Sequence, residues 1–159
     1  MAEQGAQVLS WTTGGRERLF LSPGSAADGR TPIRGGVPLC WPQFNQRGGL
    51  PKHGFARNLN WQCAEVQALD DGVEWRWHLL ADAHTRALWP HAFELELDVL
   101  VGKELSLVLT TRNTGKTPLT YNAALHTYLQ ISRPEAVSVT GLGEPYADKL
   151  TGQDGQQQG

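Results

Sequence analysis

The sequence predicts an all-β protein with the architecture of an antiparallel β-sandwich. Apolar and polar residues alternate over residues 73–79, 93–101 and 105–109, which is the period of a strand with one buried face. Turn-forming residues separate these runs. No stretch shows a long helical periodicity or an internal repeat, so neither a helical nor a repeat architecture is expected.

The first elements are short. Residues 7–11 and 18–21 are expected to form strands around a turn at Gly14-Gly15, and residues 22–29 to form a loop. Residues 32–61 contain five glycines and four prolines. This composition excludes a regular strand or helix, because Gly allows backbone angles that other residues avoid and Pro fixes the chain between them.

Longer strands follow. Residues 61–69 carry a strand pattern that ends at the turn residues 70–72, and residues 73–79 form the next strand. Residues 81–90 have room for one helical turn, which Pro90 ends.

The strongest alternation predicts a β-hairpin. Residues 93–101 and 105–109 flank Gly102-Lys103, and Gly102 is able to take the first position of a type II′ turn. The remaining expected elements are a turn at residues 113–115, a strand over 119–131 and a strand over 137–140.

Composition and charge limit the classes of function. A chain of 159 residues is long enough for one domain with a core, and its formal net charge of −2 gives no reason to expect a nucleic acid or a membrane as partner. An anionic ligand would therefore need a local basic cluster. Cys40 and Cys63 are the only cysteines, the N-terminus lacks the apolar core of a signal peptide, and no run reaches membrane-spanning length. A cytoplasmic location is expected.

The irregular segment 32–61 combines basic and aromatic side chains. Binding surfaces are often built on such segments, whereas a disordered linker seldom contains Trp, Phe and Cys. These side chains are Arg34, Arg47, His53 and Arg57, with Trp41, Phe44 and Phe55.

His126 is a candidate for proton transfer. In a strand over 119–131, the side chains of one face are nearly all apolar, and this face is expected to be the core face. His126 lies on the other, more polar face, which either lines a cleft or is exposed at the surface. A group that titrates near neutral pH suits acid–base chemistry in a cleft. The polar face carries Asn122, Ala124, His126, Tyr128 and Gln130, and the apolar face carries Ala123, Leu125, Thr127, Leu129 and Ile131.

Signals for metals and nucleotides are absent from the sequence. His78, His84 and His91 have no partners at metal-ligand spacing, and there is no H-x-x-x-H pair. The glycine motifs G-x-G-x-x-G and G-x-x-x-x-G-K-[ST] do not occur. No metal and no nucleotide cofactor are therefore expected.

Three blocks of sequence resemble one family. RGGVPLCWPQF, LPKHGFARNLNW and LHTYLQI, with VTGLG and YADK after them, are similar to the hexose-6-phosphate mutarotases, the glucose-6-phosphate 1-epimerase branch of the aldose 1-epimerase superfamily. Members of that family are about twice as long, so the chain resembles an N-terminal half. The resemblance implies a β-sandwich of the galactose-mutarotase type that is incomplete at its C-terminus. Residues 1–150 would form the N-terminal part of this domain, and residues 151–159 a polar, mobile tail.

The resemblance implies an isomerase that needs no cofactor. It would interconvert the α and β anomers of a hexose 6-phosphate, a small-molecule sugar phosphate. Ring opening needs an acid at the ring oxygen and a base at the anomeric hydroxyl, on different sides of the ring C–O bond. His126 matches the family's acid. The family's base is a glutamate of the C-terminal half, so residues 1–159 alone are expected to be inactive.

The resemblance also implies how the substrate is bound. Arg34 and Arg57 match the arginines that bind phosphate, and guanidinium groups fit phosphate oxygens well. His53 matches a histidine that hydrogen-bonds the sugar. Trp41 and Phe44 are expected to supply apolar walls or a stacking face for the sugar ring. The alternatives are a structural salt bridge for the arginines and a packing role for His53, while Arg47 is a weak candidate for the site.

Two further alternatives remain open. A carboxylate within the chain could be the base: Glu94, Glu96 and Asp98 have the pattern of a solvated sheet face, whereas Glu135, Glu144 and Asp148 lie in expected loops. The protein could also be a non-catalytic module that binds a sugar or phosphosugar, or a β-sandwich interaction domain without a ligand cleft.

Overall fold

The computed structural model describes residues 1–25, 28–29, 31–141, 145–148 and 151–156. This part of the chain is mostly strand and irregular structure. The elements in chain order are β1 (Thr12–Thr13), β2 (Arg16–Glu17), β3 (Leu39–Cys40), a 3-10 helix (Ala56–Asn58), β4 (Gln62–Leu69), β5 (Gly72–Leu80), α1 (Ala83–Leu88), β6 (Phe93–Gly102), β7 (Leu105–Asn113), β8 (Ala124–Leu125), a second 3-10 helix (Pro134–Ala136), β9 (Tyr146–Asp148) and β10 (Gln153–Gln156).

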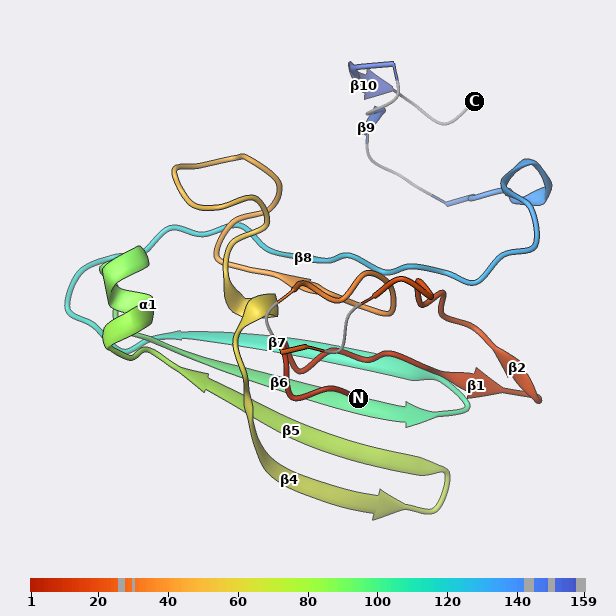
Figure 1. Ribbon diagram of the computed structural model, residues 1–159, viewed down its shortest axis with the longest axis horizontal. Coiled ribbons are helices and arrows are strands. Elements are labelled where there is room, and N and C mark those ends of the chain that lie inside the picture. The colour runs from red at the N-terminus through yellow and green to blue at the C-terminus, as the bar shows by residue number, and fades with distance from the viewer. Residues whose placement is uncertain (26–27, 30, 142–144, 149–150, 157–159) are drawn as a thin grey trace.

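The four long strands form one antiparallel sheet in the order β4-β5-β6-β7 (Figure 1). The strands predicted from the alternating runs are all present. Four inward-facing residues of β6 are at most 2% exposed, because they face the second layer of the molecule. These residues are Phe93, Leu95, Leu97 and Val99.

The β6–β7 hairpin is confirmed, but its turn is not the expected one. Gly102 belongs to β6 and is not among the glycines with a positive φ, which a type II′ turn requires at its first position. Its N–H donates to the carbonyl of Glu104 at 2.9 Å. A Cβ at position 102 would overlap the carbonyl oxygen of Asp71, so glycine is needed here for close approach of the neighbouring hairpin.

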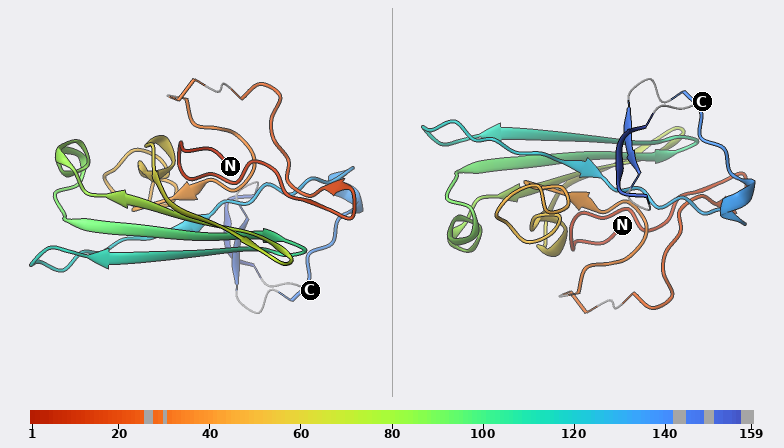
Figure 2. Two further views of the ribbon diagram at one scale, coloured as in Figure 1. Left: turned by 90° about the horizontal axis from the view of Figure 1, so that it is seen from below. Right: turned by 90° about the horizontal axis from the view of Figure 1, so that it is seen from above.

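A second layer of short and irregular segments covers one face of the sheet (Figure 2). The strands expected at residues 7–11, 18–21 and 119–131 are reduced to two-residue strands and single bridges. Their pairs include Val8 with Val37 and Leu19 with Leu129. Regular ladders are interrupted where these residues pair with the Gly- and Pro-rich segment 32–61, as Val8 and Leu21 do, because that segment cannot form a continuous strand.

The core lies between the two layers. Trp41 has no exposed surface, and its ring lies 4.6 Å from the ring of Phe93 and 5.8 Å from that of Phe55. Trp89, which follows α1, lies 5.2 Å from the same indole. The second layer therefore attaches to the sheet through aromatic contacts centred on one residue.

The predicted helical turn is confirmed as α1. Asp82 accepts a hydrogen bond from the N–H of Thr85 at 2.7 Å, and the Thr85 hydroxyl accepts one from the N–H of Asp82 at 2.9 Å. This capping box starts the helix immediately after β5. No helix among the described residues is long and apolar enough to cross a bilayer.

The prediction of a buried apolar face over residues 119–131 is wrong for the described chain. Leu125 is 39% exposed, Leu129 61% and Ile131 41%. His126 and Tyr128, on the polar face, are half-buried instead. The reason is packing: the polar face lies against the Gly- and Pro-rich segment, whereas the apolar face has no comparable cover among the described residues.

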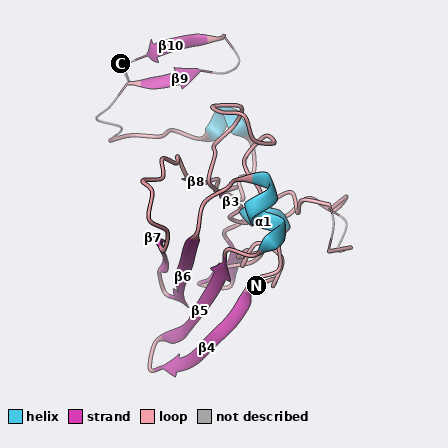
Figure 3. Cartoon of the chain, turned by 90° about the vertical axis from the view of Figure 1, so that its left-hand side faces the viewer, coloured by secondary structure: helices cyan, strands magenta, loops and turns pink. Residues whose placement is uncertain are grey.

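The C-terminal residues form a small antiparallel hairpin of β9 and β10, which lies apart from the sheet in Figures 1 and 3. Residues 153–156 of the expected tail therefore pair with β9, and residues 157–159 lie outside the described part. The strand expected at residues 137–140 is not formed.

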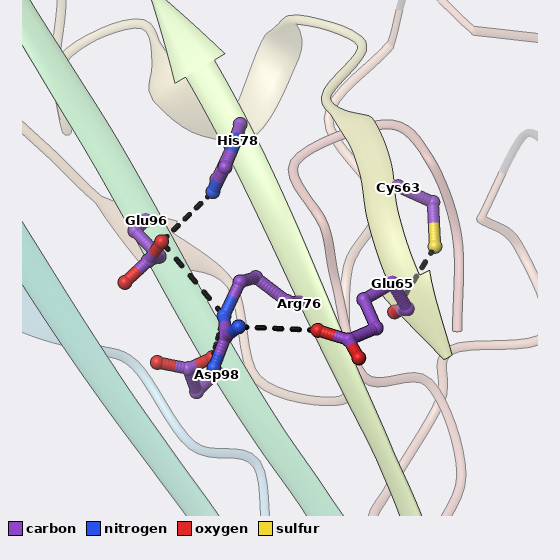
Figure 4. Close-up of polar contacts among 6 residues, drawn as sticks. All are labelled: Cys63, Glu65, Arg76, His78, Glu96 and Asp98. Carbon is purple, nitrogen blue, oxygen red and sulfur yellow. Dashed lines mark hydrogen bonds and ion pairs between the residues drawn. The ribbon is translucent and has the colours of Figure 1, made fainter. Parts of the chain in front are cut away.

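The outer face of the sheet carries a network of ion pairs (Figure 4). Arg76 on β5 contacts Asp98 on β6 at 2.8 Å and Glu65 on β4 at 3.1 Å. Its hydrogen bond and charge interaction with Asp98 raise the pKa of Arg76. His78 contacts Glu96 at 2.8 Å. Glu96 and Asp98 are therefore sheet-surface residues, as their alternation predicted.

The carboxylate of Glu17 connects the chain before β1 with the chain after β2. Glu17 accepts hydrogen bonds from the Ser10 hydroxyl and from the N–H groups of Trp11, Arg18 and Leu19. These bonds, the Ser10 bond foremost, lower the pKa of Glu17 from 4.5 to about 2. Hydrogen bonds to a carboxylate favour its charged form.

Replacing this carboxylate is expected to have a pH-dependent cost. The folded-state pKa is depressed, so the stabilisation is present above pH 4.5 and is lost as the pH falls towards 2. Glu17→Gln should lower the free energy of unfolding by about 1–2 kcal/mol at pH 7, after allowance for the exposed position. Denaturation curves between pH 7 and pH 3 should show this difference shrinking. Glu104→Gln is the matched control, and a difference independent of pH would contradict the assignment.

Candidate active site

A basic cavity of about 270 Å³ lies in the second layer. It brings together four residues that the sequence analysis singled out: Arg34, His53, Arg57 and His126. Residues from two parts of the chain, 32–57 and 126–128, line it. The complete lining is Pro32, Ile33, Arg34, Pro38, Lys52, His53, Arg57, His126 and Tyr128.

A larger depression of about 400 Å³ lies nearby and is lined by Arg47, Trp89, Tyr121 and Asn122, among others. It contains neither histidine of the basic cavity and neither Arg34 nor Arg57. The smaller cavity is therefore the candidate active site, because acid–base groups and anion-binding groups meet in it.

Arg34 precedes Gly35 and Gly36, which pack tightly on earlier parts of the chain: a Cβ on Gly35 would overlap the Phe20 carbonyl oxygen. Gly36 has a φ of +61° and packs so closely on Val8 that a Cβ would overlap the Val8 carbonyl oxygen. The Arg34 backbone is held by Ser25, whose hydroxyl accepts from its N–H at 3.0 Å and donates to its carbonyl at 2.9 Å. The backbone is thus fixed while the guanidinium group is exposed to the cavity.

Arg57 follows a sharp turn at Gly54, where a Cβ would overlap the carbonyl of Trp41. One Arg57 nitrogen, Nη2, donates to the Lys52 carbonyl at 3.2 Å. The Nε atom is buried and has no hydrogen-bond partner in the described structure. A buried donor without a partner indicates a site for a ligand or a water molecule. Beside it, burial raises the pKa of the Cys40 thiol, although the Arg57 charge opposes this.

Lys52 is a third cation of the cavity, and the sequence analysis missed it. Its position immediately before His53, a residue already expected at the site, is the sequence feature that could have identified Lys52. In the described part of the chain, no carboxylate forms an ion pair with Arg34, Lys52 or Arg57. The structural salt bridge considered for the two arginines is not found there.

Gln43 braces the loop that leads to His53, a role that the sequence did not indicate. Its Nε2 donates to the carbonyls of Asn45 and Leu50, both at 3.0 Å, and its Oε1 accepts from the Leu50 N–H at 3.0 Å. The side chain is only 2% exposed. A buried amide with all these partners holds both sides of the loop together.

His53 is held by Asn45 at both its backbone and its ring. The His53 N–H donates to the Asn45 carbonyl at 2.9 Å, and the Asn45 N–H donates to Nδ1 of the imidazole at 3.2 Å. Asn45 and His53 both have left-handed backbones, with φ of 53° and 70°. The ring is therefore placed by main-chain geometry.

His126 reaches the cavity through the pairing of β3 with β8. Leu39 pairs with Leu125, and the N–H of His126 donates to the Pro38 carbonyl at 2.9 Å. Its ring stacks on Tyr128 at 4.8 Å and meets the His53 ring edge-to-face at 5.8 Å. The two histidines therefore face the same small space.

The two aromatic residues expected at the site have different positions. Phe44 lies 5.3 Å from the ring of His53 and 6.4 Å from that of His126, so it borders the histidine pair. Its N–H donates to the side-chain oxygen of Asn122. Trp41 is fully buried and does not line the cavity, in contrast to the expectation. Its large apolar indole packs in the core.

Carboxylates are absent from the described lining of the cavity. Among the loop carboxylates considered as a base, Glu135 lies in the second 3-10 helix and Asp148 in β9, and neither lines the cavity. Glu144, like Lys149 of the third sequence block, lies outside the described residues. The described residues contain no group of three or more His, Cys, Asp or Glu that could hold a metal ion.

Residues 1–155 match the family model described as aldose 1-epimerase. The chain is 40% identical over 152 residues to an Escherichia coli K12 protein named "Putative glucose-6-phosphate 1-epimerase", covering 94% of this chain and 50% of that protein. A protein of the same name from Cenchrus ciliaris is 37% identical over 162 residues, and the match covers 48% of it. The chain thus spans about half the length of these relatives.

Solved structures show the same fold. A Salmonella typhimurium protein described as a putative mutarotase superposes with a TM-score of 0.86 at 37% identity, over 96% of this chain and 52% of that one. A Synechocystis protein superposes with a TM-score of 0.78 at 26% identity, over 99% and 60% of the two chains. The expected sandwich of the galactose-mutarotase type is confirmed.

The bracing role of Gln43 in the loop that leads to His53 can be tested by substitution. Gln43→Leu should lower the free energy of unfolding by about 2–4 kcal/mol, because backbone groups of Asn45 and Leu50 lose their partners. Chemical denaturation measures this loss. Gln46→Leu, at an exposed position of the same loop, should change the stability by no more than about 0.5 kcal/mol. Equal effects of the two substitutions would contradict the bracing role.

Proposed function

This chain belongs to the aldose 1-epimerase family, and we propose that it provides the acid and the phosphate-binding groups of a hexose-6-phosphate 1-epimerase. The enzyme would interconvert the α and β anomers of the sugar. The single observation that supports this best is the meeting of His126 with Arg34 and Arg57 in one cavity.

The charges of the cavity favour a phosphorylated sugar. Arg34, Lys52 and Arg57 supply three cations where no carboxylate of the described chain neutralises them. A phosphate monoester carries up to two negative charges and several acceptor oxygens, which suit guanidinium donors. The unpartnered Nε–H of Arg57 would be satisfied by such an oxygen.

In the proposed reaction, protonated His126 donates its proton to the ring oxygen of the sugar. The bond between C1 and the ring oxygen breaks, while a base removes the proton of the C1 hydroxyl and a C1 aldehyde forms. Rotation about the C1–C2 bond and the reverse proton transfers close the ring to the other anomer. Stacking on Tyr128 holds the His126 ring in place during both steps.

The base is proposed to be a carboxylate outside the described lining of the cavity. The relatives named as epimerases extend well beyond the match, which covers 50% of the Escherichia coli protein. A carboxylate from such an additional region would complete the acid–base pair. Residues 1–159 by themselves are then expected to give no anomer exchange above the uncatalysed rate.

The second candidate function is a non-catalytic module that binds a phosphosugar. The lack of a carboxylate in the described lining favours it, because binding needs the cations but not a base. The two candidates differ in one result: the module would bind glucose 6-phosphate without speeding anomer exchange in any form of the protein.

The arginines are expected to discriminate between phosphorylated and free sugar. Arg34→Ala or Arg57→Ala should weaken binding of glucose 6-phosphate by roughly 1.5–3 kcal/mol, the worth of a charge-assisted hydrogen bond, and hardly change binding of glucose. Titration calorimetry with both sugars measures this. Arg16→Ala, on β2 and outside the cavity, is the control. Equal losses for the two sugars would mean that the arginines maintain the fold only.

His126 is expected to carry the catalytic proton. His126→Asn should lower the rate of anomer exchange of glucose 6-phosphate by about 10²–10⁴-fold, because Asn does not titrate near neutral pH. Exchange NMR measures the rate, on a full-length protein that includes the additional region proposed to supply the base. His84→Asn, on α1 and away from the cavity, should leave it unchanged. Normal activity of His126→Asn would remove this residue from the mechanism.

A further inference from the structure

His53 shares the cavity with His126, and the direction of the hydrogen bond at its Nδ1 atom is fixed by the donor. The donor at Nδ1 is the backbone N–H of Asn45, at 3.2 Å. A backbone amide only donates, so Nδ1 must accept, and a neutral imidazole then carries its proton on Nε2. We propose that the Asn45 main chain locks His53 in the Nε2–H tautomer, so that His53 meets a ligand only as a hydrogen-bond donor.

Several hydrogen bonds of the loop, and not only the bond to Nδ1, hold Asn45 and His53 in this arrangement. The same Asn45 accepts from the His53 N–H through its carbonyl at 2.9 Å, so backbone and ring are tied to one residue. Gln43, which is buried, donates to that carbonyl as well. Asn45 has a left-handed backbone with φ of 53°, a region that Asn tolerates better than most residues. Rotating the Asn45 N–H away from the ring would disturb all of these bonds.

The lock limits the chemistry open to His53. Its Nδ1 lone pair is occupied, and its Nε2 already carries a proton. Taking up a second proton at Nδ1 would require breaking the bond from Asn45. The charged groups that line the same cavity are Arg34, Lys52 and Arg57, and the titratable neighbours of His53 there are His126 and Tyr128. His53 therefore cannot act as a base as long as the hydrogen bond from Asn45 is kept.

His126 differs in this respect. Its main chain is fixed by Pro38 and its ring by stacking on Tyr128, but the described structure shows no hydrogen bond at either of its ring nitrogens. Its imidazole can therefore gain and lose a proton without breaking such a bond. The two histidines would divide the work, with His53 as a donor that orients a sugar oxygen and His126 as the proton carrier. This division rests on the proposed epimerase function, whereas the tautomer rests on the geometry alone.

Nitrogen NMR tests the tautomer directly. Long-range ¹H–¹⁵N spectra of the ring-labelled full-length protein, assigned with His53→Gln and His126→Gln, should show the neutral ring of His53 protonated at Nε2 only at about pH 8.5, where a free imidazole is neutral. A proton at Nδ1 of the neutral ring would overturn the proposal. Replacing the amide at residue 45 by an ester removes the donor and keeps the shape, so both tautomers should then appear. An unchanged spectrum in that variant would show that Asn45 is not the cause.

The same substitution at both histidines tests the division of work. Gln keeps a neutral donor near the position of Nε2, so His53→Gln should lower the rate of anomer exchange less than about tenfold, on the scale of one hydrogen bond. His126→Gln should lower it about 10²–10⁴-fold. Equal losses would overturn the division. Absence of exchange in a wild-type protein that includes the additional region proposed to supply the base would defeat the proposed function, while the nitrogen spectra would still decide the tautomer.

Discussion

The structure of the site depends on the pairing of the segment around β3 with the segment around β8. The N–H groups of His126 and Tyr128 donate to the carbonyls of Pro38 and Gly36, and both bonds are 2.9 Å long. These bonds carry His126 to a region of the chain that already holds two arginines and a second histidine. Gly35 and Gly36 allow the same segment to approach two earlier parts of the chain, because side chains there would overlap the backbone of Phe20 and Leu21 and of Val8. Glycines and main-chain bonds therefore create the cavity, and charged side chains only line it.

Trp41 connects this cavity with the rest of the molecule. Its indole has no exposed surface and packs on aromatic rings of the sheet layer, while its carbonyl accepts from the N–H groups of Phe55 and Ala56 at 3.1 and 3.2 Å. Arg57 follows directly. Burial of a large aromatic side chain is among the stronger local contributions to folding. Trp41, expected from the sequence to stack on a sugar ring, instead anchors the loop that carries His53 and Arg57 to the core.

The charged groups on the outer face of the sheet are paired, whereas the cations of the cavity are not paired with carboxylates among the described residues. On the outer face of the sheet, Arg76 contacts two carboxylates and has a third within 3.8 Å. In the cavity, three cations have no such partners among the described residues. Exposed ion pairs of the first kind contribute little to stability, but uncompensated cations in a concave site attract anions. The basic character of the cavity therefore comes from this local arrangement and not from the net charge of −2.

The sequence by itself determined the long sheet, because strict alternation over β5, β6 and β7 has one solution that buries Leu95, Leu97 and Val99 together. Residue chemistry and the resemblance of three sequence blocks also singled out Arg34, His53, Arg57 and His126, which line one cavity in the structure. Only the tertiary structure decided which face of the chain around His126 is covered, that Trp41 is in the core, and that Lys52, Gln43 and Asn45 belong to the site. The reason is physical: periodicity reports which side chains share a face, but what packs on that face, and which main-chain groups bond to a ring, depends on segments far away in the sequence.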